Sequence, residues 1–232
     1  MAEEMNILTI LFDLDDTLIY TSKIYHRSRR KFFSALSGLG FLENEVLEKL
    51  DEIDIGHVSE QGFTKERYSY SLIKTYHYFC KKAGREPESK IEKEISEIGW
   101  KVYLQKPEQV KGAKQVLNYL KNKYKLILAT LGDPEIQHNK ISQSGLQSYF
   151  SAIHVMKHKS DEEYTQILER HQLKKEDTWI IGNSVRSDLN PGLRIGINCI
   201  LIPAGTWKFE EEDPISNNYL RLDCLTDILD YL

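Results

Sequence analysis

Residues 6–17 read N-I-L-T-I-L-F-D-L-D-D-T, a run of apolar side chains that ends abruptly at a cluster of acidic ones. A short and nearly continuous apolar run is typical of a strand buried on both faces of a parallel sheet. Four later stretches have the same character and are predicted to be strands: residues 125–130, 152–156, 178–182 and 198–202. Apolar residues recur at helical spacing between them. This alternation predicts a Rossmann-like α/β core, a parallel sheet with helices on both faces.

The stretch from about residue 20 to residue 106 breaks the alternation. It carries four amphipathic helical patterns and no convincing buried strand. Four such helices can bury their apolar stripes against one another as a small bundle. We therefore expect two domains: an α/β core formed by residues 1–18 and 107–232, and an all-helical domain, residues 19–106, inserted after the first strand.

Composition excludes several classes of protein. The chain has 232 residues, 31 Lys and Arg against 35 Asp and Glu, and a formal net charge of −4, which argues against a general nucleic-acid binder. No window approaches the roughly 20 apolar residues of a membrane span, and the start of the sequence has no signal-peptide pattern. Its three cysteines are scattered and lack C-x-x-C spacing, which favours a reducing, cytoplasmic location.

Polar residues that could act in catalysis or ligand binding follow four of the predicted strands. In open parallel sheets, ligands bind outside the carboxyl ends of the strands, so these residues are expected to converge on one edge. The candidates, in chain order, are Asp13, Asp15, Asp16 and Thr17; Thr130 and Asp133; Lys157 and Lys159; and Asn183, Ser184 and Asp188.

This set of side chains suits phosphoryl transfer. Carboxylates gathered at the end of a buried strand repel one another unless a cation neutralises them, and Mg²⁺ prefers a few hard oxygen ligands. One carboxylate can attack phosphorus, and a second can move protons to the leaving alcohol and from water. A lysine and a hydroxyl can bind the remaining phosphoryl oxygens.

The order and spacing of these residues resemble the haloacid dehalogenase (HAD) superfamily, and in particular its phosphatase branch. The D-x-D-x-T motif of that family is matched by residues 13–17, behind an apolar strand. Its strand-ending Thr or Ser is matched by Thr130, and its lysine before a helix is best matched by Lys159. Its G-(D/N)-S-x-x-S-D motif is matched by residues 182–188. Four motifs in the right order are a specific signal.

The resemblance implies roles for individual residues. Asp13 would be the nucleophile and a metal ligand, and Asp15 the general acid and base, which also lends its backbone carbonyl to the metal. The phosphoryl group would be bound by Thr130, Leu131 and Lys159, and Mg²⁺ would be bound by Asp13, Asp15, Asp188 and Asn183. Many family members have Asp in place of Asn183, so we expect weaker metal binding here.

The function expected from the resemblance is an Mg²⁺-dependent phosphatase that hydrolyses a small phosphorylated metabolite through an aspartyl-phosphate, with the helical domain as a cap that selects the substrate. Three alternatives on the same fold stay open: a phosphomutase, a haloacid dehalogenase and a non-catalytic phosphate-binding protein. Lys157 competes with Lys159 for the phosphoryl group.

Other polar residues are expected to be structural. Asp16 and Asp133 are predicted to serve turns or helix caps, and Ser184 to lie in a turn, since G-N-S-V-R lacks the second glycine of a serine-hydrolase elbow. His154 and His158 are not expected to form a metal pair. The polar run 208–218 is predicted to be an exposed loop.

Overall fold

The computed structural model describes residues 8–205 and 207–232 and divides the chain into two compact units. The first comprises the chain up to Thr21 together with Pro107–Leu232, and the second is Ser22–Lys106. Residues 19–21 fall in the first unit rather than the second, because β2 (Ile19–Tyr20) pairs antiparallel with β3 (Glu108–Gln109). These two strands are too short to show a sequence period.

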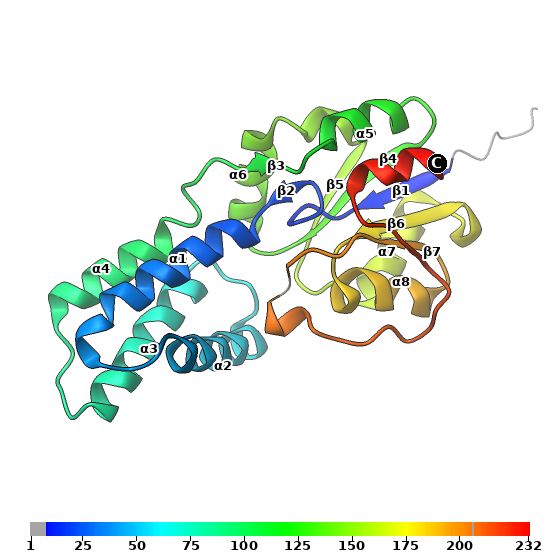
Figure 1. Ribbon diagram of the computed structural model, residues 1–232. Helices are drawn as coiled ribbons and strands as arrows, with labels where there is room; N and C mark the ends of the chain where they lie inside the picture. The colour runs from blue at the N-terminus through cyan, green and yellow to red at the C-terminus, as the bar shows by residue number, and fades with distance from the viewer. Residues whose placement is uncertain (1–7, 206) are drawn as a thin grey trace, which may run out of the picture. The chain divides into compact units, whose positions relative to one another are not determined.

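The first unit is built on a six-stranded sheet, as the alternation of strands and helices predicted (Figure 1). Its order is β5-β4-β1-β6-β7-β8, and each neighbouring pair is parallel. The bounds are β1 (Thr9–Phe12), β4 (Lys125–Leu131), β5 (Ala152–Met156), β6 (Thr178–Gly182), β7 (Asn198–Leu201) and β8 (Leu220–Arg221). Residues 6 and 7 of the first predicted strand lie outside the described residues. The strand β8 was not predicted.

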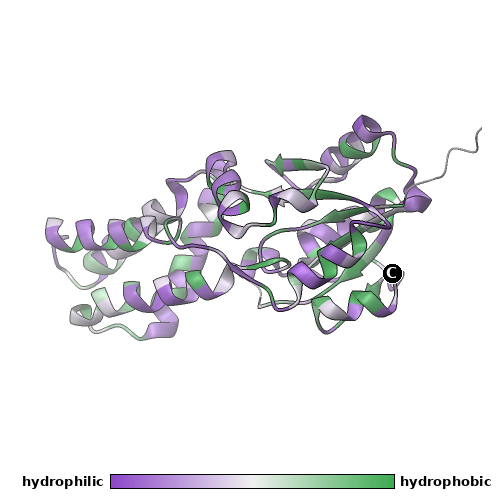
Figure 2. Ribbon diagram, turned by 90° about the horizontal axis from the view of Figure 1, so that it is seen from above, coloured by the Kyte–Doolittle hydropathy of each residue, from purple (hydrophilic) through white to green (hydrophobic). Residues whose placement is uncertain are grey.

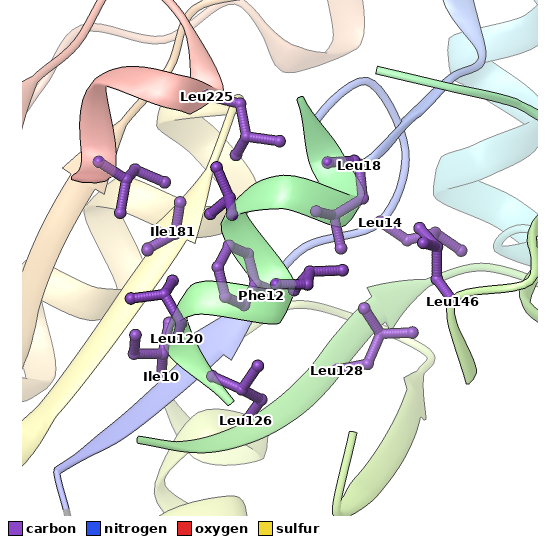
Figure 3. Packing of buried hydrophobic residues seen from close by; sticks show 14 of the residues in the cluster. Ile10, Phe12, Leu14, Leu18, Leu120, Leu126, Leu128, Leu146, Ile181 and Leu225 are labelled. Atoms are coloured by element: carbon purple, nitrogen blue, oxygen red, sulfur yellow. The ribbon is translucent and has the colours of Figure 1, made fainter. Parts of the chain in front are cut away.

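The side chains of β1 alternate between two apolar layers, which confirms a sheet covered on both faces. Ile10 and Phe12 pack with α5 (Ala113–Leu120) and η6 (Leu225–Asp230), as Figure 3 shows for the labelled residues. Leu11 points to the opposite face and packs with residues of α7 (Asp161–His171). Short α8 (Asn190–Ile195) belongs to this second layer as well. Most residues in the long strands of this sheet are accordingly apolar, while the helices carry both colours in Figure 2.

The register of the central strand β1 decides which residues lie beside the ends of its two neighbours. Phe12 is in register with Leu128 of β4 and with Ile181 of β6. Because the strands are parallel, the residues that follow Phe12 therefore emerge beside the ends of both neighbours. The next helix after β4, α6 (Pro134–Ser144), begins at Asp133, whose carboxylate accepts hydrogen bonds from the backbone N–H groups of Glu135 and Ile136, as the sequence predicted.

The second unit is helical and has a core of its own. It contains α1 (Ser22–Ala35), α2 (Glu43–Gln61), α3 (Arg67–Lys82) and α4 (Ser89–Trp100). Phe32, Leu50, Leu72, Phe79 and Ile95 are fully buried between these helices. No helix in the described part of the chain combines the length and the apolar character that crossing a bilayer requires.

A pair of histidines joins the edge strand β5 to the end of α7. The Nε2 atoms of His154 and His171 lie 2.8 Å apart, so one ring donates, the other accepts, and the accepting ring must be neutral. Burial lowers the pKa of His154, helped by His171 and Arg170; burial also lowers the pKa of His171, helped by Lys125 and Arg170. His158 is exposed.

We predict that this pair makes the protein less stable in mild acid. A lowered folded-state pKa means that the unfolded chain binds more protons, so stability present above the ordinary histidine pKa is lost as the pH falls from that value through the lowered pKa of the folded state. His171→Gln keeps a hydrogen-bonding group without that titration and should flatten the loss of stability between about pH 7.5 and about pH 5.5. Denaturant unfolding at several pH values measures it, with exposed His158→Gln as the control. Equal pH slopes for wild type and His171→Gln would refute the assignment.

Candidate active site

The acidic turn after β1 places Asp13 in the interior. Its backbone N–H continues the sheet by donating to the carbonyl of Ile181 at 2.9 Å, and its side chain is buried. The hydroxyl of Thr17 donates to Asp13 Oδ2 at 2.8 Å. Asp16 has a left-handed φ of 59°, and its carboxylate accepts from the backbone N–H of Thr21. Asp16 therefore shapes the turn, as expected, and leaves Asp13 as the buried carboxylate.

Lys159 bridges the first and last motifs. Its Nζ lies 2.5 Å from Asp13 Oδ1 and 2.5 Å from Asp188 Oδ1. All three side chains are nearly inaccessible, with that of Lys159 only 3% exposed. The competing candidate, Lys157, is exposed. The structure thus brings Asp13, Lys159 and Asp188 together, from three separate segments, and leaves Lys157 outside this contact.

Asp188 is brought to Lys159 by an unusual local backbone. It lies in a π-helical turn, η4 (Val185–Leu189), which follows β6. Its Oδ2 accepts from the backbone N–H of Ser184 at 3.1 Å, and its Oδ1 accepts from the hydroxyl of Tyr164 at 3.3 Å. A Cβ atom on Gly182 would come within 2.2 Å of Asp188 Cγ, so only glycine leaves room for this carboxylate. The hydroxyl of Ser184 caps the turn by accepting from Ser187 N–H.

Asn183 lies beside the nucleophile's turn. Its Oδ1 accepts from the hydroxyl of Thr17 at 3.3 Å, the same hydroxyl that donates to Asp13. The amide oxygen is thus one shared hydroxyl away from the Asp13 carboxylate. This placement is compatible with the expected role as a metal ligand.

Asp15 has a different environment from that of Asp13. Its Oδ1 accepts from Lys140 Nζ at 2.8 Å and from the hydroxyl of Thr21, and its Oδ2 accepts from Gln137 Nε2 at 2.8 Å. Burial alone would raise the pKa of Asp15, but Lys140 and these hydrogen bonds outweigh it and lower the pKa below its ordinary value. Asp15 is therefore ionised in this arrangement.

The segment that was expected to bind phosphate lies at the end of β4. Thr130 is fully buried, and its hydroxyl lies 2.5 Å from Gln137 Nε2. The carbonyl of Leu131 accepts from the same amide at 2.9 Å. Thr130, Leu131 and Asp15 thus share one partner on α6.

Charge and burial make the site receptive to a cation. Burial raises the pKa of Asp13, opposed by Lys159 and reinforced by Asp188 and Asp15. Burial would lower the pKa of Lys159, but Asp13 and Asp188 raise it well above its ordinary value. When all of them are ionised, three carboxylates (those of Asp13, Asp15 and Asp188) face two ammonium groups (those of Lys159 and Lys140), which leaves one formal negative charge.

The donor set fits Mg²⁺ rather than a softer metal. Within the described residues, no three His, Cys, Asp or Glu side chains cluster as a ready metal site. What the edge offers is two carboxylates and an amide oxygen, all hard donors, and Mg²⁺ is commonly bound by one or two carboxylates with substrate and water completing its shell.

Several residues at the site were missed by sequence reasoning: Thr21, Gln137, Lys140, Tyr164 and Glu210. Glu210 lies in the polar run that was predicted to be a solvated loop. That run is largely exposed, yet the Glu210 carboxylate accepts from the hydroxyls of Ser184 and Ser187, and Asn190 donates to Glu212. The run is therefore anchored to the turn that carries Asp188. Tertiary contacts of this kind leave no local pattern in a sequence.

Comparison with known proteins identifies the family. The model of the haloacid dehalogenase-like hydrolases matches residues 10–202, which is most of the chain. The chain belongs to the haloacid dehalogenase-like hydrolases. It is an enzyme of the hydrolase class, and the resemblance found in the four motifs is confirmed.

Individual members of the family show how far the likeness extends. The chain is 24% identical over 196 residues to N-acylneuraminate-9-phosphatase of Rattus norvegicus, covering 81% of this chain and 79% of the relative. A haloacid dehalogenase-like hydrolase of Xanthomonas campestris has a TM-score of 0.81 at 26% identity, covering 98% of this chain and 91% of the other. The HAD hydrolase YfnB of Bacillus subtilis, in a structure bound to magnesium, has a TM-score of 0.69 at 20% identity, covering 98% and 99%. Haloacid dehalogenases share the fold at identities from 11% to 17%.

Replacing Gly182 with alanine should lower the stability of this hydrolase. The new Cβ would collide with Asp188, so Asp188 must shift, and we expect a loss of about 1–3 kcal/mol in the free energy of unfolding. Denaturant unfolding measures the loss. Gly56→Ala is the matched control, because Gly56 lies in α2 with open space around its Cα. That change should stabilise the protein by roughly 0.5–1 kcal/mol. A Gly182→Ala variant as stable as wild type would contradict the packing described.

Proposed function

We propose that this protein is an Mg²⁺-dependent phosphatase that hydrolyses a small phosphorylated metabolite through an aspartyl-phosphate at Asp13. The observation that carries the proposal is the bridge of Lys159 between Asp13 and Asp188, beside a second, differently held acid, Asp15. Two carboxylates in contrasting environments are what a two-step reaction requires of a nucleophile and a proton carrier.

The nucleophile in this proposal is Asp13. Its carboxylate oxygen forms a bond to the phosphorus of the ester while the bond from phosphorus to the alcohol oxygen breaks. Lys159, Thr130 and the backbone at Leu131 bind the equatorial oxygens, where charge is spread in the transition state. Burial is consistent with this role, because the nucleophile and its lysine are shielded from water.

The proton carrier is Asp15. In the first step its protonated form gives a proton to the departing alcohol oxygen. In the second step the resulting carboxylate takes a proton from the water that attacks phosphorus, and inorganic phosphate leaves while Asp13 is restored. The ionised Asp15 described above corresponds to the form that acts in this second step.

Magnesium would be bound by Asp13, Asp188, Asn183 and the backbone carbonyl of Asp15. When bound, it supplies charge neutralisation between the carboxylates and the phosphoryl oxygens. The fit rests on the hard donors and on the net negative charge of the cluster.

The proposed substrate class rests on the named relatives more than on the residues at the edge of the sheet. The relatives named N-acylneuraminate-9-phosphatases act on a phosphorylated acidic sugar by their name, so sugar-acid phosphates belong first in a panel. We assign substrate selection to the helical unit, acting as a cap. A dehalogenase has no use for an acid at Asp15, since halide needs no proton to leave. A phosphomutase would transfer the phosphoryl group to a sugar rather than to water.

Removing the nucleophile tests the reaction. Asp13→Asn should lower phosphate release by roughly 10⁴-fold or more, because an amide does not attack phosphorus at a useful rate. The measurement is inorganic phosphate released from a panel of sugar-acid phosphates, sugar phosphates, nucleotides and phosphoglycolate, with Mg²⁺ and with chelator. Exposed Asp223→Asn is the matched control. Near-normal turnover by Asp13→Asn, or a wild-type rate that chelator leaves unchanged, would overturn the proposal.

A second variant tests the metal site. Asn183→Asp adds a negative charge where many relatives have one and keeps an oxygen for the Thr17 hydroxyl. The Mg²⁺ concentration for half-maximal rate should fall about fivefold, since one added charge beside a cation in a partly exposed site is worth on the order of 1 kcal/mol. Exposed Asn118→Asp on α5 should leave it unchanged. No decrease in Asn183→Asp would exclude Asn183 from the metal's surroundings.

A further inference from the structure

Two residues of α6 hold the carboxylate of Asp15 from opposite sides. Gln137 Nε2 donates to Asp15 Oδ2 at 2.8 Å, and Lys140 Nζ donates to Asp15 Oδ1 at 2.8 Å. Three positions apart on a helix, the two side chains lie on the same face. Neither belongs to the four motifs that identify the family.

Gln137 connects Asp15 to the end of β4. Its side chain is buried, with 1% of the residue exposed, and its amide nitrogen also lies 2.5 Å from the Thr130 hydroxyl and 2.9 Å from the Leu131 carbonyl. One amide group has two hydrogens, so three acceptors share them. Gly132 makes room for it: a Cβ there would lie 3.1 Å from Gln137 Cγ, on a backbone with φ of 146°.

Lys140 adds a charge to this contact. The side chains of Lys140 and Asp15 are 19% and 25% exposed, so the pair is at the border of the interior. Ion pairs of this kind stabilise a fold little. Lys140 matters more for the orientation of Asp15. Lys140 and Gln137 together bind both carboxylate oxygens of Asp15 and so oppose rotation of the carboxylate.

We propose that Gln137 and Lys140 are positioning residues for the acid-base aspartate, fixing the carboxylate of Asp15 in one orientation beside the phosphate-binding segment of Thr130 and Leu131. The proposal rests on the phosphatase function proposed above. It has a chemical consequence that a general structural role lacks. A badly placed Asp15 slows the first step, in which the alcohol leaves, only for esters whose leaving group needs a proton, and kcat/KM reports that step, whereas the second step is common to all esters.

The test compares two leaving groups. Alkyl phosphates release a strongly basic alkoxide and need the acid, whereas dinitrophenyl phosphate releases a stable phenolate and does not. Positioned general acids contribute ~10²–10⁴-fold, so Lys140→Met and Gln137→Ala should each lower kcat/KM for the best alkyl phosphate by ~10-fold or more. With dinitrophenyl phosphate the same variants should lose less than ~3-fold in kcat/KM, and Lys140→Arg should recover part of the kcat/KM for the alkyl phosphate.

Matched controls separate positioning from stability. Lys114→Met on α5 and Gln166→Ala on α7 repeat the chemical changes at exposed sites and should leave both rates unchanged. Thermal unfolding is measured for every variant, because Gln137 is buried. Equal losses of kcat/KM with both substrates, or no loss with either, would overturn the proposal.

Crystal structures of wild type, Lys140→Met and Gln137→Ala without metal give a readout independent of turnover. The proposal predicts that the Asp15 carboxylate leaves its wild-type orientation in both variants. An unchanged Asp15 in both would overturn it at any level of activity. A wild type that hydrolyses no phosphate ester would instead overturn the proposed function, while the orientation of Asp15 in these structures would still decide whether Gln137 and Lys140 position it.

Discussion

A buried ammonium group between two buried carboxylates is the interaction on which this site depends. Leaving one charge unpaired in the interior costs several kcal/mol, so Lys159, Asp13 and Asp188 are each tolerable only because the others are present. The cluster still carries an excess of negative charge once Asp15 and Lys140 are included. That excess of negative charge favours the binding of a divalent cation, and the cation in turn favours the binding of a negatively charged phosphoryl group.

The parallel sheet is what makes this meeting possible. Because neighbouring strands are parallel, their carboxyl ends lie along one edge, so residues far apart in the chain arrive there together. Local backbone features then complete the approach: a left-handed residue at Asp16, a π-helical turn around Asp188, and a glycine at position 182 that admits its carboxylate. Apolar packing on both faces of β1 holds this edge of the sheet in place, and the polar residues of the site follow the ends of the strands.

The sequence was sufficient for the fold class and for the residues that follow the strands. Apolar runs such as residues 125–130 are local signals, and motif spacing is local too, so Asp13, Thr130, Lys159 and Asp188 could all be named in advance. Gln137 and Lys140 could not, because only the packing of α6 brings them to Asp15. The partner of His154 was missed for the same reason: it is His171, on another element, and not the nearby His158. Glu210 looked like solvated surface because a charge run gives no indication of which member is anchored.

The most direct measurement is a crystal structure of the protein with Mg²⁺ and beryllium fluoride, which imitates a phosphoryl group bound to a carboxylate. The account predicts beryllium fluoride attached to a carboxylate oxygen of Asp13, contacts from Lys159 and Thr130 to the fluorides, and one Mg²⁺ bound by both Asp13 and Asp188. Beryllium fluoride attached elsewhere, or a magnesium ion that Asp13 and Asp188 do not share, would contradict it.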